Sequence, residues 1–133
     1  MKIITHKQLE VYKLSFKQAM NIFQYTRRFP REEMYSLTDQ IIRASRSVSA
    51  NIAEAYRART YEKSFISKMV IAQCEAAEVQ TWLDFALECH YLTIDEHKEL
   101  FSEYGHIIAM ILNMINNVDK WILPGRVDRG LEG

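Results

Sequence analysis

The sequence predicts an all-α protein, an up-down-up-down antiparallel four-helix bundle. Its 133 residues include only four glycines and two prolines, so few positions break a helix. Apolar residues recur at three- and four-residue steps along four long segments, which is the spacing of one buried helix face. The connections between them are roughly two to six residues long, and such short connections favour antiparallel neighbours.

The first predicted helix covers about residues 7–28 and ends before Pro30, which disfavours helix at the residue preceding it. The second begins between Arg31 and Ser36 and continues to about Arg59. We predict the buried face of the first as Leu9, Tyr12, Phe16, Ala19 and Phe23, widened by Val11, Leu14 and Ile22. The predicted buried face of the second helix is Leu37, Ile41, Ala44, Val48, Ile52 and Ala55.

The third predicted helix covers about residues 61–90, with Thr60 as its N-cap. Its buried stripe is Phe65, Met69, Ala72, Ala76, Val79, Leu83 and Ala86. Further apolar residues lie beside that stripe, more than one core requires, and they indicate a subunit interface with Trp82 and Phe85 as candidates.

The fourth predicted helix begins at a capping box formed by Thr93 and Glu96 and continues to about Trp121. Its predicted stripe is Leu100, Tyr104, Ile107, Ile108, Ile111, Met114, Ile115 and Val118. We therefore expect one bundle domain over residues 1–124 and a flexible tail over residues 125–133.

Charge is balanced over the chain, with 17 basic and 17 acidic residues, so no overall field favours nucleic acid or anionic lipid. Its distribution is uneven. Residues 1–31 hold seven lysines and arginines against Glu10 alone, whereas residues 64–100 hold two lysines against seven acids. A basic first helix and an acidic third either complement each other, within or between subunits, or form two solvated faces.

The two cysteines, Cys74 and Cys89, lie on one predicted helix about 22 Å apart, too far for a disulfide. Reduced thiols fit a cytoplasmic location. The first seven residues lack the apolar core of a signal peptide, and the longest apolar run is too short to span a membrane.

No sequence motif of catalysis or of cofactor binding is present, so we expect no enzymatic activity and no cofactor. A di-metal bundle site needs two Glu-x-x-His motifs, and this chain has one, from Glu103 to His106. The histidines and cysteines also lack zinc-ligand spacing, so no metal site is predicted.

Basic residues of the first two predicted helices are candidates for binding the phosphates of RNA or DNA. The alternative is a solvated face whose charges are neutralised by Asp39, Glu54 and Glu62. The candidates are Lys13, Lys17, Arg27, Arg28, Arg43, Arg46, Arg57 and Arg59.

Polar residues also lie close to the apolar stripe of the second helix. Asn51 and Glu54 share a helix face, with Gln40 nearby. They form either a hydrogen-bond network that fixes helix register or a binding constellation, and we favour the network.

Residues 40–55, QIIRASRSVSANIAEA, resemble the signature of the four-helix bundle proteins also called 23S rRNA intervening-sequence or S23-type proteins. Phe29-Pro30, the segment AQCEAAE at residues 72–78, Trp82-Leu83 and His90-Tyr91-Leu92 also fit, so the resemblance covers roughly residues 9–118. The resemblance implies a structural role for the signature positions Gln40, Arg43, Ala44, Ser47, Asn51, Ile52, Ala53 and Glu54.

This resemblance implies a bacterial cytoplasmic bundle without enzymatic activity that assembles as a homo-oligomeric ring, commonly a pentamer. A related branch serves as the accessory protein of diversity-generating retroelements, where a basic ring binds nucleic acid and a reverse transcriptase. Two departures matter. Ala55 and Arg57 stand where the family often has glycine, so the helix should continue further, and this chain is neutral whereas the accessory branch is basic. We rank nucleic-acid binding first and a protein–protein scaffold that docks a partner on Trp82 and Phe85 a close second.

Overall fold

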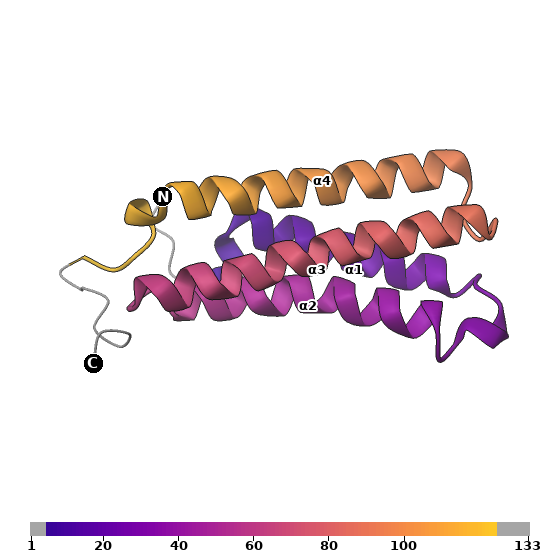
Figure 1. Ribbon diagram of the computed structural model, residues 1–133, viewed down its shortest axis with the longest axis horizontal. Coiled ribbons are helices and arrows are strands. Elements are labelled where there is room, and N and C mark those ends of the chain that lie inside the picture. The colour runs from indigo at the N-terminus through magenta and orange to yellow at the C-terminus, as the bar shows by residue number, and fades with distance from the viewer. Residues whose placement is uncertain (1–4, 125–133) are drawn as a thin grey trace.

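The structure is a computed structural model that describes residues 5–124, and these form a bundle of four α-helices (Figure 1). The helices are α1 (Glu10–Thr26), α2 (Leu37–Arg57), α3 (Glu62–Glu88) and α4 (Ile94–Asn116), with 3-10 helices at His6–Gln8, Arg31–Glu33 and Val118–Lys120. In the bundle α2 packs on α3, α3 packs on α4, and α1 packs on both α2 and α4. The predicted four-helix bundle is confirmed, and the predicted tail, residues 125–133, lies outside the described residues.

The N-terminal part of the bundle differs from the prediction of one helix starting near Lys7. Thr5 and Gln8 form a capping box that opens the 3-10 helix His6–Gln8. Leu9 is then extended, and α1 begins at Glu10. The predicted stop before Pro30 is confirmed. α2 continues to Arg57, as expected from the absence of glycine in its last turn.

The turns around α3 and α4 show which caps the sequence revealed. The N-cap residue of α3 is Tyr61, and its side chain makes no capping hydrogen bond. The prediction of Thr60 as the N-cap is therefore wrong by one residue. The end of α3 is a Schellman motif, with His90 at φ 63° and the Tyr91 N–H donating to the Ala86 carbonyl at 2.8 Å. The capping box of α4 is confirmed, with Glu96 N–H donating to Thr93 Oγ1 at 3.1 Å.

The core comprises the predicted stripes of α2 and α3, every residue of which is buried. The predicted stripe of the fourth helix is buried at Leu100, Tyr104, Ile107, Ile111 and Met114, and half-buried at Ile108, Ile115 and Val118. α4 ends at Asn116, earlier than the predicted Trp121, so Val118 lies in the 3-10 helix that follows. The Tyr104 hydroxyl has no hydrogen-bond partner within residues 5–124, and burial raises its pKa. None of the described helices combines the length and the apolar character needed to cross a membrane.

The buried face of α1 is the main error of the sequence prediction. The residues that α1 buries are Val11, Ser15, Gln18, Ile22 and Thr26. Three of these are polar, and each is hydrogen-bonded: the Ser15 hydroxyl, for example, lies 2.9 Å from that of Ser49 on α2. Because polar residues occupy the inner face, the aromatic stripe lies at its edge, and Phe16 is 52% exposed.

Candidate nucleic-acid interface

The signature segment of α2 contributes to the core through Ala44 and Ile52, which are buried. Its polar residues make separate contacts. The Asn51 amide donates to the Ser47 carbonyl at 2.9 Å, within the same helix. Glu54 instead forms an ion pair with Lys68 of α3 at 2.9 Å.

The third residue of the expected network, Gln40, takes no part in it. Gln40 is exposed and makes no side-chain hydrogen bond inside the described range, while Ala53 is half-buried. The predicted network that fixes helix register is therefore reduced to one link between helices, the ion pair of Glu54 with Lys68.

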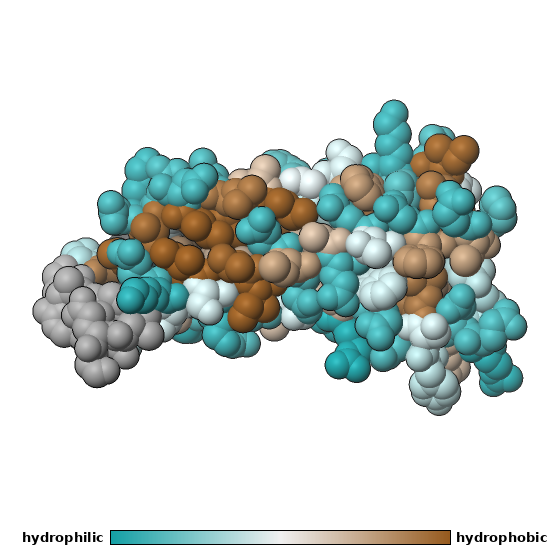
Figure 2. All heavy atoms as spheres, viewed as in Figure 1, coloured by the Kyte–Doolittle hydropathy of each residue, from teal (hydrophilic) through white to brown (hydrophobic). Residues whose placement is uncertain are grey.

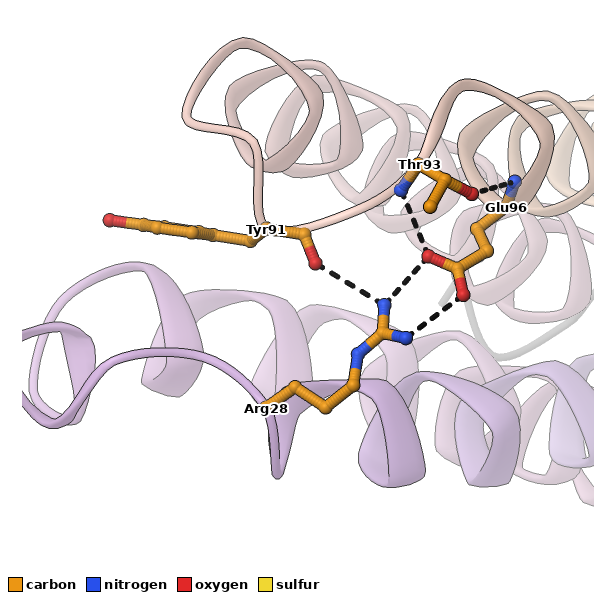
Figure 3. A network of polar contacts seen from close by, with 4 residues as sticks. All are labelled: Arg28, Tyr91, Thr93 and Glu96. Carbon is orange, nitrogen blue, oxygen red and sulfur yellow. Dashed lines mark hydrogen bonds and ion pairs between the residues drawn. The ribbon is translucent and has the colours of Figure 1, made fainter.

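Arg28 follows the end of α1 and is held by groups of the α3–α4 turn (Figure 3). Its guanidinium donates to both oxygens of Glu96, at 2.9 and 2.6 Å, and to the Tyr91 carbonyl at 3.3 Å. Glu96 also accepts the Thr93 N–H at 2.9 Å. The Tyr91 hydroxyl donates to Glu33 at 2.8 Å, so this end of the bundle is tied together by side chains from several turns.

These contacts change the acid–base behaviour of both acceptors and donors. The hydrogen bond from Arg28 and that from the Thr93 backbone lower the pKa of Glu96 from 4.5 to about 2. The hydrogen bond to Glu33 raises the pKa of Tyr91 to about 12. Arg28 therefore stabilises a carboxylate, and this contact competes with phosphate binding by the same guanidinium.

The variant Glu96→Gln is expected to lower the free energy of unfolding at neutral pH by about 1 kcal/mol, since Arg28 is about half exposed and solvent screens the pair. Glutamine still serves a capping box, so the change isolates the charge. Because folding lowers the pKa of Glu96, its stabilisation is complete above about pH 4.5 and disappears as the pH falls to about 2.

Urea unfolding of the wild type and the variant, measured across that pH range, tests this expectation. Glu99→Gln, at an exposed position of the same helix, is the matched control. A difference between wild type and Glu96→Gln that stays constant from neutral pH to about 2 contradicts the assigned role of the charge.

Arg59 is also occupied by contacts within the chain. Its Nε donates to the Tyr56 carbonyl at 2.7 Å, and its guanidinium lies 3.7 Å from the centroid of the Tyr56 ring. The Arg59 carbonyl accepts the Leu123 N–H at 3.2 Å. Like Arg28, this candidate phosphate ligand fixes a turn of the bundle.

The other six candidate cations are exposed on α1, α2 and the first residue after α1, and we call them the basic surface. Two have acidic neighbours: Lys13 lies 3.5 Å from Glu10, and Arg43 lies 3.7 Å from Asp39. Such exposed pairs within one helix are weak. Within the described residues the other four have no acidic partner. The basic surface consists of Lys13, Lys17, Arg27, Arg43, Arg46 and Arg57.

An aromatic row, His6, Tyr12, Phe16 and Phe23, follows the seam between α1 and α2 beside these cations. The ring centroids of His6 and Tyr12 lie 4.9 Å apart, and those of Tyr12 and Phe16 lie 6.0 Å apart. Arg46 lies over the Phe23 ring at 5.6 Å. Sequence reasoning placed three of these residues in the core, so it missed this surface.

Cations also accompany the aromatic row at its other positions. A surface pocket of about 430 Å³ is lined by Lys7, Tyr12, Lys13 and Phe16. A second pocket of about 420 Å³, at the start of the row, is lined by His6 and Arg57 together with the ion pair of Glu54 and Lys68. Rings and cations therefore lie together along one seam of the bundle.

The acid-rich residues 64–100 do not neutralise the basic surface within the described part of the chain. α1 and α3 lie diagonally in the bundle, and the acid that reaches the α1 end is Glu96 of α4. The expected complementarity between the first and third helices is therefore not formed inside the subunit.

The second candidate surface lies where α2 begins and α3 ends. The Trp82 indole N–H donates to Glu78 at 3.2 Å, and its ring lies 5.8 Å from that of Phe85. Phe85 is 54% exposed, and Tyr35 beside it is 90% exposed. These residues line a pocket of about 360 Å³.

A third surface, which we call the apolar strip, covers the first half of α3 and the second half of α4 (Figure 2). The Gln80 amide donates to the Phe101 carbonyl at 3.2 Å, and this antiparallel register brings these two halves side by side. Val70 is 41% exposed and Leu112 is 39% exposed. The apolar strip consists of Ile66, Val70, Ile108, Leu112 and Ile115.

The residues considered for metal binding are not gathered in one place. Glu103 accepts a hydrogen bond from Gln18 at 3.3 Å, and His106 is exposed. The described residues contain no group of three or more His, Cys, Asp or Glu side chains that could hold a metal ion. Both cysteines are free and exposed.

The antiparallel bundle and its α2 signature define the class of protein, and a family model agrees with them. The model described as 23S rRNA-intervening sequence protein matches residues 7–113. The chain therefore belongs to this family. No curated protein matches it.

A solved structure supports the same assignment. It is a protein of unknown function from the S23 ribosomal protein family of Bacteroides thetaiotaomicron VPI-5482, 27% identical in sequence, with a TM-score of 0.73. The similarity covers 80% of this chain and 95% of that one.

Proposed function

We propose that this protein is a non-enzymatic, homo-oligomeric bundle that binds RNA or DNA through the basic surface of α1 and α2. The observation that carries the proposal is the set of four exposed cations, Lys17, Arg27, Arg46 and Arg57, without acidic partners in the described residues. Phosphates attract such cations, and the counterions that they release favour binding. A neutral chain can still bind when its acids lie on other faces.

We propose that the oligomer forms by covering the apolar strip, as a ring of five subunits. Exposed apolar residues that adjoin one another on two helices are typical of an interaction site. In a closed ring each subunit repeats the basic surface, so several weak phosphate contacts act on one polynucleotide. This repetition compensates for the small number of free cations on each subunit.

A protein–protein scaffold is the alternative function, and the exposure of Phe85 beside Trp82 favours it. Aromatic residues that line a pocket are typical anchors of protein interfaces. Binding of this kind depends little on salt and is lost on Trp82→Ala, provided that the variant keeps the helical content of the wild type.

Light scattering after size exclusion, with and without a structured RNA, tests the proposal. We expect a mass above that of one subunit, which rises with RNA at ~50 mM salt and returns to the protein mass by ~200 mM salt. An assembly that ignores RNA at both salt concentrations contradicts nucleic-acid binding. A plain monomer contradicts the oligomer.

A further inference from the structure

We infer that the seam between α1 and α2 binds single-stranded nucleic acid, with bases stacked on the exposed Phe16 ring and on the half-buried rings of the aromatic row, and with phosphates held by the cations beside it. This inference rests on the proposed function and names the form of its ligand. Duplex recognition requires an element that enters a groove or tracks the backbone, whereas a single strand offers bases that stack on aromatic side chains.

The exposure and spacing of the rings support a stacking surface. Phe16 is 52% exposed, Tyr12 contacts it at 6.0 Å between centroids, and Phe23 lies two helical turns further along the same side of α1. On a helix these positions repeat about every 6 to 10 Å along the axis. The rings therefore form a linear series rather than one cluster.

The cations lie where a backbone that follows the rings would pass. Arg46 from α2 lies over Phe23 at 5.6 Å, and Lys13 shares the pocket of Tyr12 and Phe16. Arg57 lies with His6 in the pocket at the start of the row. Positive charge at three points along a row of rings complements a single strand, which carries a phosphate for every base.

An apolar partner protein is a different occupant for the same rings, and the cations argue against it. Lysine is depleted from the cores of protein interfaces, whereas arginine is enriched there. Two lysines, Lys7 and Lys13, line the pocket beside Tyr12 and Phe16, and lysines at this place disfavour a protein partner.

The test compares the affinity for a short oligouridine with that for an RNA duplex of equal length, by fluorescence anisotropy at ~50 mM salt. Phe16→Leu removes the ring but keeps an apolar side chain, and Phe16→Trp keeps a ring. We expect Phe16→Leu to weaken single-strand binding roughly 5- to 10-fold and leave duplex binding unchanged. Phe16→Trp should bind as the wild type does, with its fluorescence quenched by the bases.

Phe85→Leu is the matched control, because it makes the same chemical change at a side chain that is 54% exposed on α3, away from the aromatic row. If the wild type binds duplex and single strand with equal affinity and Phe16→Leu changes neither affinity, the inference is overturned and the proposed function still stands. Absence of binding to both RNAs overturns both. A loss of oligomer mass in Phe16→Leu overturns the inference in favour of a subunit contact.

Discussion

Reversing the charge of Arg46 and Arg57 is expected to reduce the affinity for a short single-stranded RNA about 100-fold at ~50 mM salt. Both guanidinium groups are exposed, and neither has an acidic partner in the described residues. The double variant Arg46→Glu with Arg57→Glu removes two phosphate contacts and adds two repulsive charges at opposite ends of the aromatic row. The loss of the contacts and the added repulsion each raise the free energy of the complex.

The salt dependence gives a second, independent expectation. Each phosphate contact to a single strand makes the slope of log affinity against log salt steeper by about 0.7. Loss of two contacts should therefore make the slope of the double variant about 1.4 shallower than that of the wild type. Anisotropy titrations at four salt concentrations measure both quantities.

The control is Lys98→Glu with Lys120→Glu, which changes the net charge by the same amount on exposed residues of α4 and of the last 3-10 helix. If the control loses as much affinity as the α2 variant, binding depends on net charge and not on the basic surface. If neither loses affinity, phosphate contacts do not hold the RNA.

The helices themselves could be predicted because their signals are local. Apolar spacing identified the buried faces of α2 and α3, and the capping residues Thr93 and Glu96 identified the start of α4. Reliance on local signals also limits how accurately the ends of helices can be predicted. Thr60 and Tyr61 are adjacent, and the observed N-cap of α3 makes no side-chain hydrogen bond that the sequence could reveal.

The face of α1 could not be predicted from apolar spacing, because its inner face depends on partners from other helices. Ser15 is buried because it meets Ser49 of α2, and Gln18 because it reaches Glu103 of α4. The sequence carries a weak signal for this arrangement. Tyr12, Phe16 and Phe23 form one stripe while Val11 and Ile22 form another, so α1 has more apolar surface than one face can bury.

The candidate site was predicted only as a set of residues. Eight cations were named, but helical position alone does not show that Arg28 binds Glu96 or that Arg59 lies on Tyr56. In both contacts the arginine lies in a turn just after a helix, where the chain direction depends on the whole fold. The pairing of Arg43 with Asp39 could be anticipated, since the two residues are one helical turn apart.

The second large effect is expected for Phe65→Ala, on the buried face of α3. This variant should lower the free energy of unfolding by about 3–4 kcal/mol. Phe65 is 1% exposed, so truncation leaves a cavity as well as removing apolar contact. Phe85→Ala is the matched control, with the same chemical change on the same helix at a side chain that is 54% exposed. In an isolated subunit this control should change stability by less than about 0.5 kcal/mol.

Urea unfolding at two protein concentrations measures both variants and separates two kinds of burial. A cost for Phe65→Ala below about 1 kcal/mol contradicts its place in the core. The stability of an oligomer depends on protein concentration, so a residue buried between subunits matters more when the assembly is populated. A cost for Phe85→Ala that grows with concentration therefore places Phe85 in a subunit interface, whereas a cost near zero at both concentrations leaves it on a surface free to bind another protein.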